Sequence, residues 1–115
     1  MRGGTMLNGR RKVPDDQLVV CSREQRTVVL GRDAGCDVVV ESKAASREHC
    51  TIEWCENDFL VCDHSNNGTY VSLPANGEVL VHNENMILPE EGTIAIGEES
   101  ARAAEVVEFS YAVVT

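Results

Sequence analysis

Short runs of β-branched and other apolar residues recur along the chain, each ended by a cluster of glycine, asparagine, aspartate, serine or proline. β-Branched residues favour strands, and turn residues end them. No stretch keeps an apolar period of 3.6 residues, except weakly at 98–109. The pattern predicts an all-β fold, a two-sheet antiparallel β-sandwich whose loops gather at its ends and carry function. The predicted strands are 17–20, 27–31, 37–41, 49–55, 58–64, 68–72, 77–81, 85–88, 92–97 and 106–114.

The length of 115 residues is enough for one domain that buries a single core without disulfides or metals. We expect residues 1–115 to form this domain, with a core from about 15 to about 112 and with 1–4 as a flexible leader or fusion remnant. The apolar runs are too short to cross a bilayer, and the amino terminus lacks the apolar segment of a secretory signal. A cytoplasmic protein without membrane contact is therefore expected.

The cysteines are odd in number and show no C-x-x-C spacing, which favours a reduced chain. Alternation within "HCTIEWC" places Cys50 on the same strand face as Ile52 and Trp54, where a small buried side chain fits. A zinc site is the alternative, but the spacing of its ligands matches no common zinc pattern. We therefore expect no metal and no cofactor. That alternative site would draw on Cys50, Cys55, Cys62, His49 and His64.

The net charge of −9 is unevenly distributed along the chain. Residues 1–50 hold nine of the ten Lys and Arg and seven acids, whereas residues 51–115 hold one base and twelve acids. Binding of nucleic acid needs a clustered excess of positive charge over many phosphates, so it is not expected. A small local site for an anion remains compatible with the first half, and the acidic half is interpreted as a solvated surface.

Polar and charged residues concentrate in three loops: "GRDAGCD" at 31–37, "ESKAASREHC" at 41–50 and "DHSNNGTYV" at 63–71. If the strands alternate in direction, the second and third loops lie at the same end of the sandwich. Strict alternation places Arg32 at the opposite end. The run between the first two loops spans only about 13 Å, however, and a sandwich can switch sheets there. We therefore expect Arg32 to join the other two loops.

These loops contain the groups that bind a phosphate on a peptide. The guanidinium groups of Arg32 and Arg47 match phosphate oxygens, and the Ser46 hydroxyl adds a neutral donor. Asn67 carries a donor and an acceptor for a peptide main chain, and Gly68 permits positive φ in the turn that presents it. Charge-assisted bonds of about 1.5–3 kcal/mol each would support micromolar affinity, about −8 kcal/mol.

The motifs "LGRDAGCDVVV", "ASREHCTIEW" and "LVCDHSNNGTYV", in this order and spacing, resemble the forkhead-associated (FHA) domain over residues 28 to 97. The resemblance implies a β-sandwich that binds phosphothreonine in a partner protein or in another part of its own chain. Arg32 and Ser46 would hold the phosphate, with Arg47 beside them along the peptide. Asn67 would bind the ligand main chain and Asn66 would line the site. Structural support would come from Gly31, His49, which braces the second loop, and Gly68.

The pattern departs from the family after Tyr70, because "VHNENMILPEEGTIAIG" lacks the usual glycine–aspartate pair before the last strands. With "AAEVVEFSY", this tail is similar to FHA modules attached to bacterial class III nucleotide cyclases. That similarity implies a regulatory module of a larger protein, such as an adenylate or guanylate cyclase, whose chemistry lies outside these residues.

Catalysis is not expected. Ser46, His49 and Asp63 include the residue types of a hydrolytic triad, but no G-x-S-x-G elbow surrounds the serine. The loop "GRDAGCD" lacks the Lys-Ser/Thr ending of a nucleotide-binding P-loop. The main alternative is a phosphate-independent interaction or dimerisation module that uses sheet faces or edges. Asp33 and Glu48 favour this alternative, because acids beside the arginines weaken attraction for phosphate.

Overall fold

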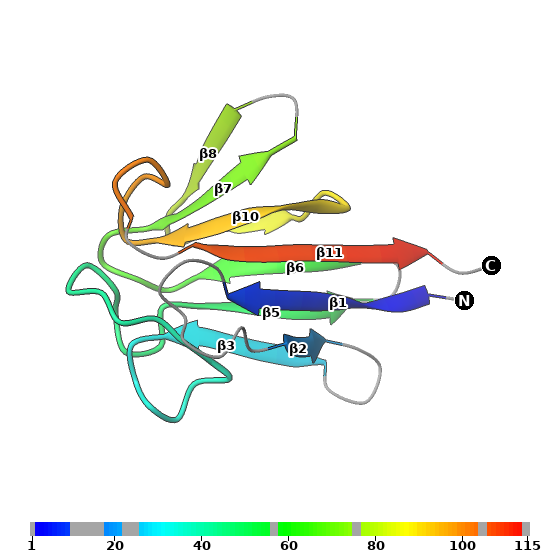
Figure 1. Ribbon diagram of the computed structural model, residues 1–115, viewed down its shortest axis with the longest axis horizontal. Helices are drawn as coiled ribbons and strands as arrows, with labels where there is room; N and C mark the ends of the chain where they lie inside the picture. The colour runs from blue at the N-terminus through cyan, green and yellow to red at the C-terminus, as the bar shows by residue number, and fades with distance from the viewer. Residues whose placement is uncertain are drawn as a thin grey trace.

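The computed structural model describes residues 2–9, 18–21, 26–55, 58–74, 77–103 and 106–113. Its strands are β1 (Arg2–Gly9), β2 (Leu18–Cys21), β3 (Thr27–Gly31), β4 (Val38–Val39), β5 (Cys50–Cys55), β6 (Asp58–Asp63), β7 (Thr69–Leu73), β8 (Gly77–Val81), β9 (Asn85–Ile87), β10 (Glu91–Ile96) and β11 (Val107–Val113). A 6-stranded sheet has the order β2-β1-β11-β10-β7-β8, and a 5-stranded sheet has the order β4-β3-β5-β6-β9 (Figure 1). The predicted two-sheet β-sandwich is confirmed.

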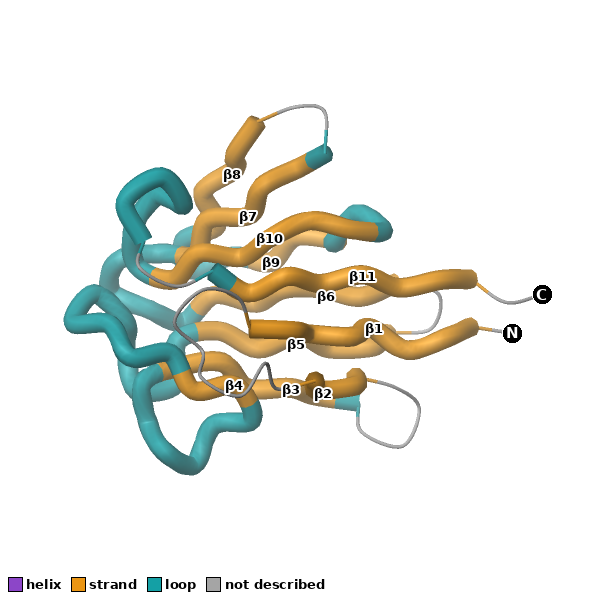
Figure 2. Tube along the Cα trace, viewed as in Figure 1, coloured by secondary structure: helices purple, strands orange, loops and turns teal. Residues whose placement is uncertain are grey.

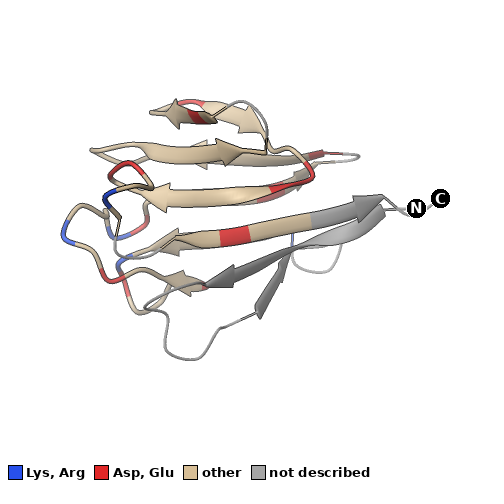
Figure 3. Cartoon of the chain, turned by 45° about the horizontal axis from the view of Figure 1, so that its top comes forward, with Lys and Arg blue, Asp and Glu red and all other residues tan. Residues whose placement is uncertain are grey.

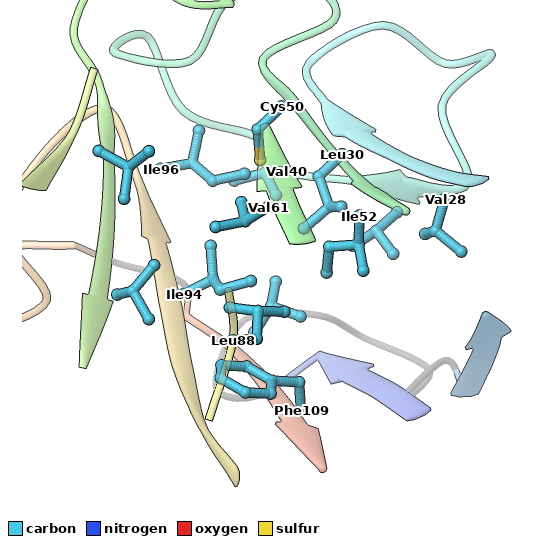
Figure 4. Packing of buried hydrophobic residues seen from close by; sticks show 14 of the residues in the cluster. Val28, Leu30, Val40, Cys50, Ile52, Val61, Leu88, Ile94, Ile96 and Phe109 are labelled. Atoms are coloured by element: carbon cyan, nitrogen blue, oxygen red, sulfur yellow. The ribbon is translucent and has the colours of Figure 1, made fainter. Parts of the chain in front are cut away.

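Alternating side chains in β5 and β6 explain how the sheets enclose a core. Cys50 and Ile52 are fully buried, whereas Glu53, which lies between Ile52 and Trp54 in β5, is exposed. Ile52 lies opposite Val61 in the antiparallel pair, so both point into the same layer. Burying one such side chain contributes about 1.5–3 kcal/mol. Figure 4 shows these residues meeting side chains of the other sheet, among them Ile94, Ile96 and Phe109.

Cys50 belongs to this core, as its place in the alternation predicts. Burial raises the pKa of its thiol to about 12, so the group is a neutral apolar side chain at physiological pH. Cys55, at the other end of the same strand, is exposed. Within the described residues no group of three His, Cys, Asp or Glu side chains has an arrangement suited to a metal ion.

Strand β1 is not predicted by the sequence pattern. It lies between β2 and β11, with Thr5 opposite both Cys21 and Tyr111. Residues 2–4 lie within this strand. The segment "RGGTMLNG" has no β-branched alternation, but main-chain hydrogen bonds to two neighbours form whatever the side chains are.

Strands β3 and β4 pair in parallel, with Leu30 opposite Val38 and Gly31 opposite Val39. The other strand pairs of the described residues are antiparallel. The strict alternation of direction considered above is therefore wrong at this connection. Because parallel strands end at the same edge, the residue that follows β3 lies at the same end of the sandwich as the residues that follow β4.

The edge strands β8 and β9 carry the exposed large apolar side chains of the described residues. Val79 is 37% exposed, Leu80 45% and Ile87 57%. β8 is an edge strand of the larger sheet, and β9 is an edge strand of the smaller sheet. Nothing helical in the described parts of the chain has the length and apolar character that crossing a bilayer would need.

Candidate functional site

Three loops gather at one end of the sandwich (Figure 2). They follow β3 (residues 32–37), β4 (40–49) and β6 (64–68). The first and second are brought to the same end by the parallel pairing of β3 and β4. In Figure 3 Lys and Arg segments and acidic segments are interspersed in the loops at this end of the sandwich.

Main-chain hydrogen bonds join the first two loops. The amide of Arg32 donates to the Ser46 carbonyl at 3.0 Å, and the amide of Asp33 donates to the Arg47 carbonyl at 3.1 Å. Gly31 makes this approach sterically feasible, because a Cβ atom there would overlap the Arg47 carbonyl. A side chain at residue 31 would therefore separate Arg32 from Ser46.

The side chain of Arg32 is exposed but held in place. Its Nε donates to the Ala45 carbonyl at 3.1 Å, a bond that crosses from the first loop to the second. This bond engages Nε alone, so both Nη groups of the planar guanidinium can donate to a ligand. The carboxylate of the adjacent Asp33 accepts from the Gly35 amide at 3.0 Å and so caps its own turn.

The third loop is tied to the second by its two asparagines. The amide nitrogen Nδ2 of Asn67 donates to the Ala44 carbonyl at 2.9 Å, and the main-chain amide of Asn66 donates to Ser46 Oγ at 3.3 Å. Both asparagines are exposed. Asn67 keeps Oδ1 and a second N–H for a ligand, and Ser46 keeps its hydroxyl proton as a donor.

Arg47 lies in the same region, although its contacts are made by its carbonyl. That carbonyl accepts from the Asp33 amide and from Cys36 Sγ, the latter at 3.1 Å. Its side chain is exposed. The structure thus joins Arg32, Ser46, Asn66 and Asn67 by hydrogen bonds through the second loop, and it places the Arg47 main chain beside them.

His49 is fully buried beneath the second and third loops. Its Nδ1 accepts from the Ser46 amide at 3.0 Å, and its Nε2 donates to the Gly68 carbonyl at 2.7 Å. This pair of bonds requires the neutral ring with the proton on Nε2. Burial lowers the pKa of His49, and the Gly68 bond and the Asp63 charge oppose that shift in part. Because His49 bonds the Ser46 main chain, its Nδ1 is not available as a base for the Ser46 hydroxyl.

The low pKa of His49 makes stability depend on pH. The ring has a pKa of 6.5 in the unfolded chain and a lower one in the folded chain. Its contribution is complete above pH 6.5 and is lost as the pH falls through the folded-state pKa. We expect urea unfolding of the wild type to show this loss. His49→Gln should be less stable at pH 7.5, but its free energy of unfolding should lack this part of the dependence on pH. The same dependence on pH in both proteins would contradict the assignment.

Asp63 is a buried carboxylate that organises the third loop, a role that the sequence analysis missed. It accepts from Ser65 Oγ and Thr69 Oγ1, each at 2.7 Å, and from the amides of Ser65 and Asn83. Ser65 Oγ in turn accepts from the Gly68 amide at 2.8 Å. Burial alone would raise the pKa of Asp63, but these hydrogen bonds lower it. The signal was the spacing D-x-S within a turn, a common pattern of side chain to main chain bonding.

Gly97, which directly follows β10, is a second residue that the sequence analysis did not place near the site. Its amide donates at 2.9 Å to the Gly68 carbonyl, which also accepts from His49. Its φ is +82°, and a Cβ atom there would overlap the main chain of Ala44, the residue that accepts from Asn67. Gly97 therefore supports the second and third loops together. No local sequence signal marks this role.

Comparison with known proteins gives one family and one fold. The family model described as FHA domain matches residues 28–97. The FHA-1 domain of Rv1747 from Mycobacterium tuberculosis superposes with a TM-score of 0.66 at 21% identity, covering 94% of this chain and 97% of that one. The yeast Pml1 splicing factor gives a TM-score of 0.74 at 17% identity, with coverage of 96% and 81%.

A structure from work on phosphothreonine-dependent FHA domain interactions is also similar. It gives a TM-score of 0.68 at 18% identity and covers 96% of this chain and 99% of that one. Comparison with curated proteins found no match. At these identities the structural likeness establishes the fold, and the residues of the loops must carry any argument about binding.

Proposed function

The chain belongs to the FHA domain family, and from this premise we propose that it is an interaction module that binds phosphothreonine peptides. The observation that carries the proposal is the convergence of Arg32, Ser46 and Asn67 through hydrogen bonds to one loop, 44–46. Two Nη donors and a hydroxyl can bind the phosphate, and the amide of Asn67 can pair with the ligand main chain. Arg47 and Asn66 complete the proposed site.

Charge supports a phosphate ligand in spite of the acidic chain. Phosphothreonine carries about −1.5 to −2 charges at pH 7, and the guanidinium of Arg32 is fixed where its Nη groups remain available. The nearest acid in sequence is Asp33, whose carboxylate accepts a hydrogen bond from the Gly35 amide in its own turn. Local donors act over a few ångströms, whereas the net charge of the surface is screened beyond about 8 Å in physiological salt. Local attraction therefore outweighs distant repulsion.

The proposal is tested by titrating the protein with three peptides of one sequence that contain phosphothreonine, phosphoserine or threonine. Isothermal titration calorimetry should give micromolar affinity for the phosphothreonine peptide, weaker binding of the phosphoserine peptide and none of the unmodified one. Affinity should fall with added salt, because the contact is between charges. Equal affinity for the three peptides would overturn the proposal.

Gly97 offers a test of how the loops are held. We expect Gly97→Ala to lower affinity for the phosphothreonine peptide about tenfold and to lower stability by about 1–3 kcal/mol, since both φ and the contact with Ala44 are disturbed. Gly92→Ala is the matched control near the other end of β10, where a Cβ would overlap the Ser72 carbonyl and lie 2.9 Å from Phe109 Cζ. It should lose stability but keep its affinity. Unchanged affinity of folded Gly97→Ala would contradict this role.

The wider context is also a proposal. The similarity of the carboxy-terminal stretch to FHA modules of nucleotide cyclases supports a regulatory role within a larger protein, with no catalysis in these residues. Addition of the phosphothreonine peptide to a longer chain carrying a cyclase domain should then change cyclase activity. The same addition would leave activity unchanged if the module only anchors a partner.

A second candidate function is self-association through a sheet edge. It is favoured by Val79, Leu80 and Ile87, which are exposed on the edge strands β8 and β9. Exposed apolar edges can pair with a second chain. Sedimentation velocity at rising protein concentration tests this function. A dimer that barely responds to salt supports it, and a monomer at about 100 μM or above excludes it.

A further inference from the structure

The third loop contains an Asn-Gly pair, Asn67 and Gly68, within the proposed site. In such a pair the main-chain nitrogen of the glycine can attack the side-chain carbonyl carbon of the asparagine, because glycine has no Cβ that hinders the approach. Asparagine is for this reason a chemically labile residue in proteins. Asn67 is exposed to the water that the reaction consumes. The pair is therefore a candidate site of covalent modification that needs no enzyme.

The reaction converts the amide of Asn67 into a carboxylate in two steps. The Gly68 nitrogen forms a bond to Cγ of Asn67, the Cγ–Nδ2 bond breaks, and the proton lost by Gly68 leaves with the amide group as ammonia. Water then opens the resulting five-membered succinimide ring and supplies OH to the attacked carbon and H to the ring nitrogen. Attack at Cγ gives aspartate, and attack at the main-chain carbonyl carbon gives isoaspartate. Neither step needs an oxidant or a reductant.

Hydrogen bonds hold both reacting groups in the folded protein. The attacking group, the Gly68 amide, donates to Ser65 Oγ at 2.8 Å in a buried contact. The attacked side chain, that of Asn67, donates through Nδ2 to the Ala44 carbonyl at 2.9 Å. Ser65 Oγ is fixed in turn by its 2.7 Å hydrogen bond to Asp63. Attack needs the Gly68 amide to meet a base and the Asn67 side chain to turn toward it, so both bonds must break first.

The other side of Gly68 is fixed as well. Its carbonyl accepts from His49 Nε2 at 2.7 Å and from the Gly97 amide at 2.9 Å, and its φ is +87°. The approach of the Gly68 nitrogen to Asn67 requires rotation of the peptide unit between them, and the bonds on both sides of Gly68 oppose that rotation. The reaction is therefore expected only from a state in which the third loop has opened locally.

We propose that Asn67 is a deamidation site that the hydrogen bond between the Gly68 amide and Ser65 keeps closed, and that the deamidated module no longer binds its phosphopeptide. The product has a carboxylate in place of the group that donates to Ala44, so two acceptors face each other. It also adds a negative charge to a loop of the phosphate site. The loss of binding rests on the proposed function, whereas the closed deamidation site does not.

The chain contains its own reference, because Asn76 and Gly77 form another Asn-Gly pair. Gly77 lies opposite Leu73, at the end of β8 away from the third loop. Wild type and Ser65→Ala are incubated at mildly alkaline pH, and mass spectrometry of proteolytic peptides measures deamidation at each pair. In Ser65→Ala, Asn67 should react about tenfold faster than in wild type, because one hydrogen bond no longer opposes opening. Asn76 should react at the same rate in both proteins.

Measurements on the wild type alone cover the case in which Ser65→Ala fails to fold. In urea, Asn67 and Asn76 should react at similar rates, because the dipeptide is the same and the fold is absent. Without urea, the reaction of Asn67 should be slower by about tenfold or more. A saturating phosphothreonine peptide should slow it further, because a ligand that contacts Asn67 favours the closed loop. Hydrogen exchange should show the Gly68 amide protected in wild type.

The product is mimicked by Asn67→Asp, which should lower affinity for the phosphothreonine peptide by about tenfold or more. Asn76→Asp is the matched control, because it adds the same charge at the other pair, and it should keep affinity within about twofold of wild type. Thermal unfolding checks that both variants are folded. Separation of the deamidated from the intact wild type by ion exchange allows the same comparison on the natural product.

The outcomes separate the two proposals. If Asn67 reacts as fast in the folded wild type as in urea, or if Ser65→Ala accelerates Asn67 and Asn76 equally, the closed deamidation site is refuted and the proposed function stands. If the deamidated wild type binds the phosphothreonine peptide as tightly as the intact protein, the effect on binding is refuted. If no phosphothreonine peptide binds the intact protein, the proposed function fails, and the deamidation rates still decide whether the fold protects Asn67.

Discussion

Replacement of Arg32 by alanine is expected to reduce affinity for a phosphothreonine peptide by about a hundredfold or more. The guanidinium can make two charge-assisted bonds to phosphate, each contributing about 1.5–3 kcal/mol, and a hundredfold change corresponds to about 2.7 kcal/mol. The fold should be retained, because the side chain is exposed and the Arg32 amide still donates to Ser46. Calorimetry gives the affinity, and thermal unfolding checks the fold.

Two further variants separate geometry from charge at this position. Arg32→Lys keeps the charge but loses the planar fork and the bond to Ala45, so we expect an intermediate loss of about tenfold. Arg26→Ala removes a charge at the far end of β3 and should change affinity by less than about twofold. Binding by Arg32→Ala within about threefold of wild type would show that the phosphate is held elsewhere.

Replacement of Asp63 by alanine should have the largest effect on stability, a loss of about 3–5 kcal/mol. The change leaves the hydroxyls of Ser65 and Thr69 and the amide of Asn83 without their acceptor in a buried region. Each buried donor without a partner costs about 1–3 kcal/mol, although such costs do not add fully. Against a typical total of about 5–15 kcal/mol, this loss should be plain in urea unfolding.

Asp58→Ala is the matched control, because Asp58 begins the same strand and is exposed. It should change stability by less than about 0.5 kcal/mol. In Asp63→Ala, phosphopeptide affinity at low temperature should also fall, since Ser65 no longer orients the loop that carries Asn66 and Asn67. Equal stability of Asp63→Ala and Asp58→Ala would contradict the structural role assigned to Asp63.

Much of the fold was predictable because strand signals are local. In β5 and β6 alternating side chains mark the buried face, and Cys50 was correctly assigned to it. β1 was missed because its side chains have no such alternation. Its strand conformation is held by hydrogen bonds to β2 and β11, which lie on either side. A strand that is defined by its neighbours has no signal in its own segment.

The candidate site could be predicted in its residue types and only partly in its arrangement. Arg32, Ser46 and Asn67 stand out because exposed donors concentrate in turns, where they have no packing role. The two supports of the loops, Asp63 and Gly97, were not recognised as such. The D-x-S spacing could have marked the local bonds of Asp63 to Ser65. Its bond to Asn83, and the close approach of Gly97 to Ala44, join residues 20 and more positions apart, so nothing in the flanking residues announces these two contacts.

The amino-acid sequence by itself determined the class of fold, the buried face of the strand that carries Cys50 and Ile52, and the set of polar groups offered by the loops. These properties depend on side-chain periodicity and on turn residues, which act over a few positions. Only the tertiary structure decided that β3 and β4 run in parallel, that Arg32 consequently lies beside Ser46, and that Gly97 closes on Ala44. Those outcomes depend on which distant main chains satisfy one another's hydrogen bonds, and that choice is made by the packed chain as a whole.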